Sequence, residues 1–269
     1  MNIKKIVKAL LYKLLTGKKG YTDLKVLSGP AKGAKLRLDI RKEGSYWLGN
    51  YDRWIFDAIP FNKIIKPGFI IWDCGAYVGY YTAAFRKIIG DKGLIHVFEA
   101  SNNNYERLKF LPKLNNWDNV KILNMAVGPE HTTLQFVNNL GGANGPYNLS
   151  KTYAQSINEL DIEIIRSCGV DELVYELGIE APDFIKFDLE TGEEFALHNG
   201  GKVFREKRPL VLLELHGEKA KEAAGLFFEK YNYGGVFMSD MPHATKRIRS
   251  LTEFQKFNGI PHMVFCIPE

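Results

Sequence analysis

The feature that most constrains the fold is a short apolar run that leads through an acidic residue into two glycines. Residues 70–72 are apolar, Asp73 follows them, and Gly75 and Gly79 precede a stretch with helical spacing. Such a run is typical of a buried parallel strand, and glycine allows a tight turn and the close approach of a ligand to the backbone. The pattern predicts the strand, loop and helix of a Rossmann-like α/β unit.

Further apolar runs alternate with helical patterns along the chain. Strands are predicted over residues 69–72, 94–98, 120–123, 183–187, 210–215, 235–239 and 262–267, with an additional strand over 131–137 and a loop over 138–150. Helices are predicted over 79–89, 102–114 and 217–231 and from about residue 193, with Ser101 as an N-cap. This alternation indicates a mostly parallel, seven-stranded sheet with helices on both faces.

Residues 1–60 differ from the rest and are predicted to form a small cap on a domain of residues 61–269. Residues 2–15 read as a basic amphipathic helix, whose apolar stripe packs on the protein, meets an anionic membrane surface or forms an oligomer contact. Residues 21–40 indicate a small antiparallel β element. A short helix within residues 44–60 is expected to cover the core with Trp47, Tyr51, Trp54, Ile55 and Phe56.

Composition limits the classes of partner. The formal net charge is +5, and the first 20 residues alone hold six lysines and no acidic residue, so the remainder is near neutral. Charge therefore gives no reason to expect a nucleic-acid partner. Three cysteines without a CxxC pair indicate neither a zinc site nor a disulfide framework, and they favour the reducing cytoplasm.

A second acidic residue, Glu99, ends the second predicted strand, 26 residues after Asp73. At that position of a βαβ unit a carboxylate can accept both hydroxyls of a ribose. The glycine spacing departs from GxGxxG, and Asp73 would repel a pyrophosphate. It suits a cationic ligand such as S-adenosylmethionine, whose α-amino group Asp73 could hold through water. A glycine turn without a ligand and a nicotinamide or flavin site are the alternatives.

Five stretches in order resemble the FkbM-type methyltransferases: residues 67–82, 96–108, 124–128, 183–200 and 208–215. The resemblance extends over about residues 28–240. It implies a class I methyltransferase fold with S-adenosylmethionine as the methyl donor. It also implies O-methylation of a hydroxyl on a sugar, glycan or natural-product scaffold.

The resemblance also implies roles for individual residues. The donor site is expected to comprise Asp73, Gly75, Ala76, Tyr77, Gly79, Glu99, Ala100, Asn124, Met125 and Ala126. Within that set Glu99 matches the ribose carboxylate, and residues 124–126 fall where such folds border the adenine. Asp188 and Glu190 match an acidic motif after the fourth strand. Two departures stand out, because the family commonly has asparagine at Tyr77 and glycine at Thr191.

An alcohol acceptor has to lose a proton, and three candidate bases follow predicted strands. Asp188 and Glu190 lie two residues apart, so in an extended segment they point the same way. His216 follows the fifth strand and titrates in the right range. Turn capping by the acids and a hydrogen-bonded loop histidine are the structural alternatives. A divalent cation on Asp188 and Glu190 is not predicted, because the sequence reveals no further ligand cluster.

Other functions remain open at this point. An N-methyltransferase acting on an amine or a nucleic acid usually carries an Asn/Asp-Pro-Pro-aromatic motif where this chain has Asp188-Leu189-Glu190-Thr191. A non-catalytic module that binds the donor is a second alternative, and a nicotinamide oxidoreductase is a third. A late basic cluster of His243, Lys246, Arg247 and Arg249 is a solvated face or a docking point for an acidic acceptor.

Overall fold

The computed structural model describes residues 20–138, 145–146, 161–237, 248–256 and 263–269. The predicted helix over residues 2–15, most of the predicted loop over 138–150, and His243, Lys246 and Arg247 lie outside the described residues. No helix in the described part of the chain combines the length and the apolar character needed to cross a membrane.

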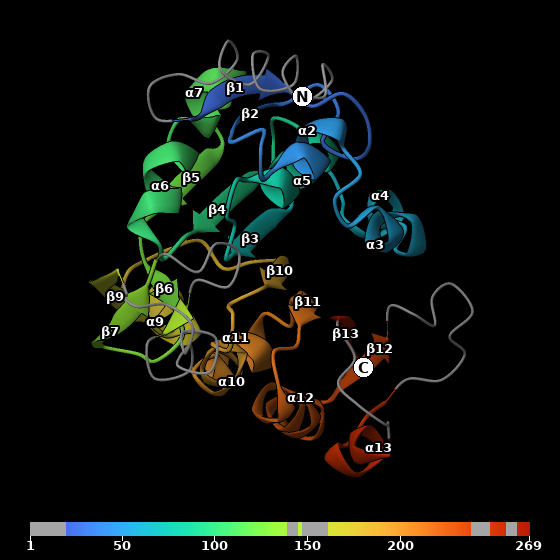
Figure 1. The fold of residues 1–269 in the computed structure, drawn as a ribbon. Helices are drawn as coiled ribbons and strands as arrows, with labels where there is room; N and C mark the ends of the chain where they lie inside the picture. The colour runs from blue at the N-terminus through green and yellow to red at the C-terminus, as the bar shows by residue number, and fades with distance from the viewer. Residues whose placement is uncertain (1–19, 139–144, 147–160, 238–247, 257–262) are drawn as a thin grey trace, which may run out of the picture.

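A seven-stranded sheet forms the centre of the molecule (Figure 1). Its strands, in spatial order, are β12 (Tyr233–Phe237), β13 (Met263–Pro268), β11 (Leu210–Glu214), β10 (Phe184–Phe187), β3 (Ile70–Cys74), β4 (Leu94–Phe98) and β5 (Val120–Leu123). Every pair from β11 to β5 is parallel, and only β13 runs antiparallel to its neighbours. The predicted mostly parallel, seven-stranded sheet is confirmed.

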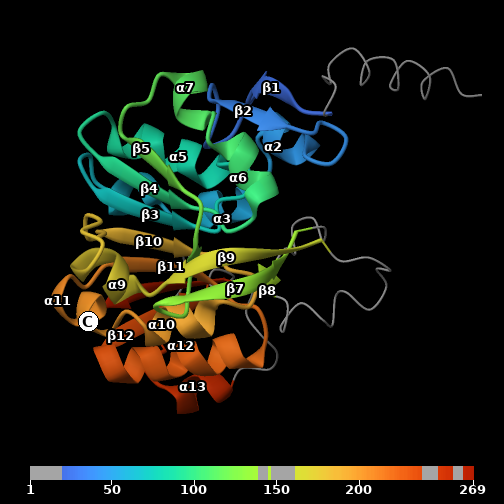
Figure 2. The same ribbon diagram turned by 90° about the vertical axis from the view of Figure 1, so that its left-hand side faces the viewer.

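Helices cover both faces because alternate strand residues point to opposite sides. In β3, Ile71 belongs to one buried apolar cluster and Trp72 to the other. The first cluster includes residues of α3 (Arg53–Ala58), α4 (Phe61–Ile64), α5 (Tyr80–Ile89), α6 (Asn102–Leu108) and α7 (Leu111–Asn115). The second includes residues of α9 (Val170–Tyr175), α10 (Glu193–His198), α11 (Gly201–Glu206), α12 (Glu218–Tyr231) and α13 (Leu251–Gln255) (Figure 2).

A second, four-stranded sheet was not predicted. Its order is β6 (Ala126–Val127), β9 (Ile162–Cys168), β7 (Thr132–Val137) and β8 (Gly145–Pro146). The additional strand predicted over 131–137 corresponds to β7, which pairs antiparallel with β9. The sequence analysis missed β9 because one of its faces exposes apolar side chains, Ile162 and Ile164, so its pattern of apolar residues does not match that of a half-buried strand.

Residues 20–60 contribute to the same apolar cluster as α5. Their antiparallel element is confirmed as β1 (Thr22–Lys25) paired with β2 (Lys35–Leu38). The single helix predicted within 44–60 is wrong: α2 (Gly44–Leu48) ends at Gly49, whose φ of +80° takes the left-handed conformation, and α3 begins at Arg53. Trp54 is 45% exposed and does not cover the core as expected.

The helix predicted over residues 102–114 is also divided, into α6 and α7. The prediction of Ser101 as the N-cap is confirmed, because its hydroxyl accepts a hydrogen bond from the backbone N–H of Asn104. Pro112 has no N–H to donate to the carbonyl of Leu108, four residues earlier, and this missing hydrogen bond explains the break.

Candidate functional site

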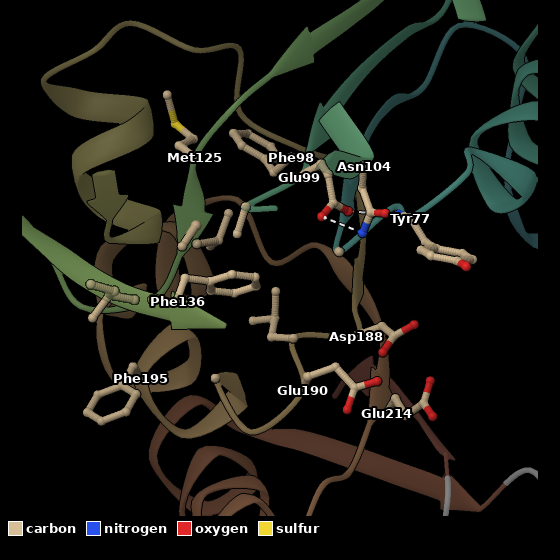
Figure 3. Close-up of a pocket in the computed structure, with 18 of the residues that line it drawn as sticks. Tyr77, Phe98, Glu99, Asn104, Met125, Phe136, Asp188, Glu190, Phe195 and Glu214 are labelled. Atoms are coloured by element: carbon tan, nitrogen blue, oxygen red, sulfur yellow. Dashed lines mark hydrogen bonds between the residues drawn. The ribbon is translucent and has the colours of Figure 1, made fainter. Parts of the chain in front are cut away.

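A cavity of about 470 Å³ lies at the carboxyl ends of β3, β4, β10 and β11, where parallel α/β sheets usually bind ligands. Residues of β6 and β7 form another part of its wall, so the second sheet encloses the site. In Figure 3, Met125, Phe136 and Phe195 lie on one side of the cavity and Asp188, Glu190 and Glu214 are grouped at another. Its volume lies in the usual range for a small-molecule site.

The cavity brings together most of the residues that the sequence predicted for the site. Those on its wall are Gly75, Tyr77, Glu99, Ala100, Met125, Ala126, Asp188 and Glu190. The predicted residues that are not on its wall are Asp73, Ala76, Gly79, Asn124 and His216. Asn124 has a supporting position, since its side-chain amide donates to the backbone carbonyls of Glu99 and Ala100.

Glu99 is buried at the end of β4 and is held by three donors. Its Oε2 accepts from the backbone N–H of Tyr77 at 2.8 Å, and its Oε1 accepts from Ser101 N at 3.0 Å and Asn104 Nδ2 at 3.3 Å. Burial raises the pKa of Glu99 to about 7, although these hydrogen bonds oppose the shift. The carboxylate is fixed in one orientation on the cavity wall, with acceptor capacity left on Oε2.

The two glycines of the loop are required by close packing. Gly75 has a φ of +78°, and a Cβ added there would lie 1.7 Å from the carbonyl oxygen of Asp188. The loop after β3 therefore touches the backbone of the loop after β10. Gly79 also has a positive φ, and a Cβ there would lie 2.6 Å from Leu111. Both positions accept only glycine without rearrangement.

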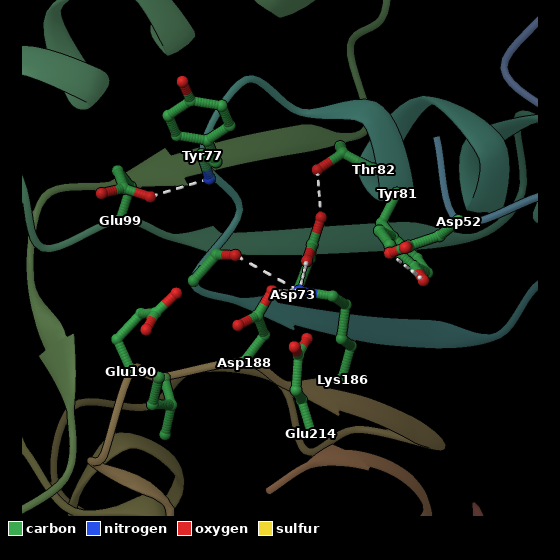
Figure 4. Close-up of polar contacts among 12 residues, drawn as sticks. Asp52, Asp73, Tyr77, Tyr81, Thr82, Glu99, Lys186, Asp188, Glu190 and Glu214 are labelled. Atoms are coloured by element: carbon green, nitrogen blue, oxygen red, sulfur yellow. Dashed lines mark hydrogen bonds and ion pairs between the residues drawn. The ribbon is translucent and has the colours of Figure 1, made fainter. Parts of the chain in front are cut away.

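Asp73 lies beneath the cavity and not on its wall. It is fully buried, and its Oδ2 accepts a hydrogen bond from the hydroxyl of Thr82 (Figure 4). Its Oδ1 lies 3.8 Å from Lys186 Nζ. Burial raises the pKa of Asp73, and Lys186 opposes this shift. That Asp73 holds the amino group of the donor stays a prediction.

Lys186, which the sequence analysis missed, is the cation at the centre of this cluster. Only 2% of it is exposed, and its ammonium donates to Asp188 Oδ2 at 3.0 Å and to the carbonyl of Gly75 at 3.3 Å. Burial alone would lower the pKa of Lys186, but Asp188, Asp73 and Glu214 outweigh it and raise the pKa. A lysine between apolar residues of a predicted buried strand was the signal that could have found it.

Further acids gather around Asp188. Glu190 and Glu214 both line the cavity, and burial raises their pKa values to about 7 and about 8. His216 Nε2 lies 3.6 Å from each of these carboxylates, and its Nδ1 lies 2.8 Å from the fully buried Glu193. Burial lowers the pKa of His216, but Glu193, Glu190 and Asp188 outweigh it and raise the value to about 9.

One part of this cluster has the geometry of a cation site. Asp188, Glu214 and His216 each offer a ligand atom, and these atoms all lie within 4.8 Å of one another. The ammonium of Lys186 already binds Asp188, however, and a bound cation would be repelled by it. The arrangement is explained by hydrogen bonds within the protein: Lys186 holds Asp188, and Glu193 holds His216.

The backbone after β10 is strained at the acidic motif. Glu190 has a φ of +47° and Thr191 a φ of +84°. Such values are unusual for residues other than glycine, and most unfavourable for a β-branched one such as threonine. Thr191 Oγ1 is also buried without a hydrogen-bond partner among the described residues. The family's glycine at this position would avoid both costs.

An aromatic wall from the N-terminal segment was also missed. Tyr46 and Tyr51 line the cavity, and their rings stack with centroids 4.1 Å apart. The ring of Tyr77 lies 5.7 Å from that of Tyr46. Nothing in the local pattern of residues 44–60 distinguishes a tyrosine that faces a ligand from one that packs in the core.

All charged residues on the described part of the cavity wall are acidic: Glu99, Asp188, Glu190 and Glu214. A wall of this charge attracts a cationic ligand and repels a phosphate-bearing one. It therefore fits a nucleoside that carries a sulfonium and an ammonium group, and it does not fit a dinucleotide.

Comparisons with known proteins agree with this chemistry. A family model described as "Methyltransferase FkbM domain" matches residues 73–254, more than half of the chain. Among curated proteins no sequence matches the chain.

Solved structures share parts of the fold at low sequence identity. A methyltransferase FkbM from Methylobacillus flagellatus KT is 14% identical with a TM-score of 0.48, and the match covers 75% of this chain but only 44% of that one. A precorrin-6y C5,15-methyltransferase from Geobacter metallireducens is 10% identical, with coverage of 77% and 81% and a TM-score of 0.40. Fibrillarin from Aeropyrum pernix, solved with bound S-adenosyl-L-methionine, is 13% identical, with coverage of 75% and 67% and a TM-score of 0.35.

Proposed function

The chain belongs to the FkbM family of S-adenosylmethionine-dependent methyltransferases, and from this premise we propose that it methylates a hydroxyl group of a sugar, glycan or natural-product acceptor. The observation that carries the proposal is a single cavity whose described charged residues are all acidic. Glu99 lies among the predicted donor residues, and Glu190 and Glu214 lie apart from it beside Asp188; burial raises the pKa values of all three glutamates. One group of residues suits the binding of a cation, and the other suits removal of a proton.

S-adenosylmethionine, when bound, supplies a methyl group activated by a positively charged sulfur. In this proposal Glu99 accepts hydrogen bonds from the ribose hydroxyls, while Gly75, Ala100, Met125 and Ala126 shape the rest of the donor side. Because the methyl donor is reactive, alignment of the acceptor oxygen with it provides much of the rate enhancement.

We assign the proton of the acceptor hydroxyl to Glu190. As the acceptor oxygen bonds to the methyl carbon, the carbon–sulfur bond breaks and its electron pair stays on sulfur. The hydroxyl proton moves to the Glu190 carboxylate, whose pKa of about 7 suits a base at neutral pH. His216 is a weaker candidate because it lies off the cavity wall and, with a pKa of about 9, is protonated at neutral pH. Asp188, held by Lys186, orients the acceptor.

The aromatic wall supports a sugar or polyhydroxylated scaffold as the acceptor. Tyr46 and Tyr51 offer an apolar surface, and the neighbouring carboxylates offer hydrogen-bond acceptors. A sugar presents both an apolar face and hydroxyl donors, so it matches the two surfaces together. The acidic wall does not favour a nucleic-acid acceptor.

We also propose that the protein works in the cytoplasm, because its three cysteines, Cys74, Cys168 and Cys266, are free and buried. Peripheral contact with an anionic membrane through residues 2–15 stays a prediction.

The proposal is tested in two steps. Calorimetric titration with S-adenosylhomocysteine should show one site per chain, and NADH should not compete. Methyl transfer from labelled S-adenosylmethionine is then measured across sugars, glycosides and polyhydroxylated natural products, with amines and nucleic acids in a parallel set. We expect an O-methylated product, located by mass spectrometry and NMR. A methyl group found on nitrogen, or donor binding without transfer to any acceptor, would contradict it.

A further inference from the structure

A buried glutamate of the N-terminal segment reaches the donor loop. Glu43, which precedes α2, is almost fully buried, and its Oε1 accepts from the hydroxyl of Tyr77 at 2.5 Å and from Arg107 Nη1 at 2.7 Å. Its Oε2 accepts from the backbone N–H of Asp39 at 2.8 Å. Both carboxylate oxygens are therefore engaged, and one of them binds two residues beside the cavity.

Two hydrogen-bonded routes lead from Glu43 to Glu99. Along the first, Tyr77 donates its hydroxyl to Glu43. Its backbone N–H donates to Glu99 Oε2 at 2.8 Å, the bond drawn in Figure 4. Along the second, Arg107 Nη2 donates to Asn104 Oδ1 at 3.2 Å, and Asn104 Nδ2 donates to Glu99 Oε1 at 3.3 Å. The routes end on different oxygens, so together they fix the plane of the Glu99 carboxylate.

The backbone of Tyr77 shows why such a tether matters. Its φ of +53° lies in the left-handed region, which is unfavourable for a residue with a side chain. In this conformation the N–H of Tyr77 donates to Glu99. The phenol hydroxyl, bonded to Glu43, holds the residue in that conformation from its other end. An asparagine at this position would be too short to reach from the backbone of residue 77 to the Glu43 carboxylate.

We propose that Glu43 is a positioning residue for the donor site, acting through Tyr77 and Arg107 on Glu99. The inference rests on the proposed function, in which Glu99 binds the ribose of the donor. It makes the segment around Glu43 part of the donor site, although Glu43 is not on the cavity wall.

The charges of Glu43 and Arg107 decide which variant can test the proposal. Glu43 and Arg107 form a buried ion pair, with side chains 3% and 5% exposed. Removing the charge of Glu43 would leave Arg107 buried and unpaired, which destabilises a protein strongly. Tyr77→Phe removes only the hydroxyl and keeps the ring, over which the Arg107 guanidinium lies at 4.7 Å. Tyr77→Phe is therefore the primary variant.

The test measures the affinity of the full-length protein for S-adenosylhomocysteine by calorimetry. Tyr77→Phe is expected to stay folded with a lowered melting temperature, because a hydrogen bond to a buried carboxylate is lost. It should bind at least fivefold more weakly and raise the KM for the donor while the KM for the acceptor stays the same. Tyr175→Phe is the matched control, because it removes another hydrogen bond from a phenol to a glutamate, the 2.8 Å bond to Glu206, away from the cavity. The control should bind like the wild type.

A double-mutant cycle separates an effect that Glu43 exerts through Tyr77 from a general loss of structure. If Glu43 acts through the Tyr77 hydroxyl, Glu43→Gln with Tyr77→Phe should lose less affinity than the two single losses combined. Equal binding by Tyr77→Phe and the wild type would overturn the inference while leaving the proposed function intact. A wild-type protein that does not bind S-adenosylhomocysteine would overturn both.

Discussion

At one end of the cavity Glu99 receives three hydrogen bonds and is linked through Tyr77 and Asn104 to a buried ion pair. Near Asp188, by contrast, the carboxylates crowd together around Lys186 and His216, and the backbone is strained at Glu190. Burial raises the pKa values of both groups, but hydrogen bonds oppose the shift at Glu99, whereas neighbouring carboxylates add to it at Glu190 and Glu214.

This difference matches two different roles for a carboxylate in the site. A carboxylate that only has to bind can be satisfied from all sides. A carboxylate that has to accept a proton must be held in a less favourable state, by burial and by like charges. Buried atoms without a hydrogen-bond partner in the described structure occur at both ends. Asp73 Oδ1, Thr191 Oγ1 and Glu193 Oε2 lie in or against the acidic cluster, and Arg107 Nε lies in the ion pair behind Glu99.

The largest expected effect tests the acidic cluster. Glu190→Gln keeps the shape of the side chain but removes the base, so kcat should fall by about 100-fold or more. Affinity for S-adenosylhomocysteine should change less than twofold. Glu194→Gln, on the next helix and off the cavity wall, is the control and should turn over normally. Equal kcat values for Glu190→Gln and the wild type would assign the proton to another group.

The second effect tests the Glu99 end. Because burial raises the pKa of Glu99 to about 7, part of the free protein carries it neutral at neutral pH. The ionised form is the better partner for a cationic nucleoside, so donor affinity should rise from pH 6 to pH 8 and then level off. Glu99→Gln should bind at least tenfold more weakly at pH 8, about 1.4 kcal/mol.

Calorimetric titration of the donor at several pH values between 6 and 8 tests whether Glu99 causes this rise in affinity. The slope of affinity against pH should be smaller in Glu99→Gln than in the wild type, since Glu190 and Glu214 still titrate in both proteins. Identical slopes would mean that the donor does not sense the charge of Glu99.

Much of the fold could be predicted because its signals are local. The apolar run before Asp73, the glycines and the alternation of patterns each lie within a few residues, and they led to the main sheet. The breaks in the helices were harder. Pro112 divides a stretch whose periodicity reads as one helix, and β9 joins a small sheet whose partners lie elsewhere in the sequence.

Prediction of the site from the sequence has the same limit, since local signals find a residue but not its partners. Glu99 and Gly75 were found because residues that follow parallel strands meet at one edge. The same rule does not say which way a side chain turns, and Asp73 lies beneath the cavity beside Lys186. Lys186 was missed because two of the three acids that hold its charge, Asp73 and Glu214, belong to β3 and β11, strands distant in the sequence.

The smallest effect isolates the strain of the acidic loop. Thr191→Gly relieves a left-handed threonine and removes a buried hydroxyl without a described partner. It also adds freedom to the unfolded chain, so the net gain in the free energy of unfolding should be about 1 kcal/mol. Urea denaturation measures this gain. Thr191→Ala is the comparison, because it removes the hydroxyl and the γ-methyl group but keeps a Cβ in the left-handed conformation.

Turnover of the same variant connects strain with chemistry. If the strained turn holds Glu190 against the acceptor, Thr191→Gly should lower kcat several-fold while raising stability, the usual exchange at an active site. Donor affinity should stay unchanged, because the Glu99 network does not include Thr191. A variant that is both more stable and equally active would show that the strain serves no catalytic purpose, and that the two ends of the cavity differ only in how their carboxylates are surrounded.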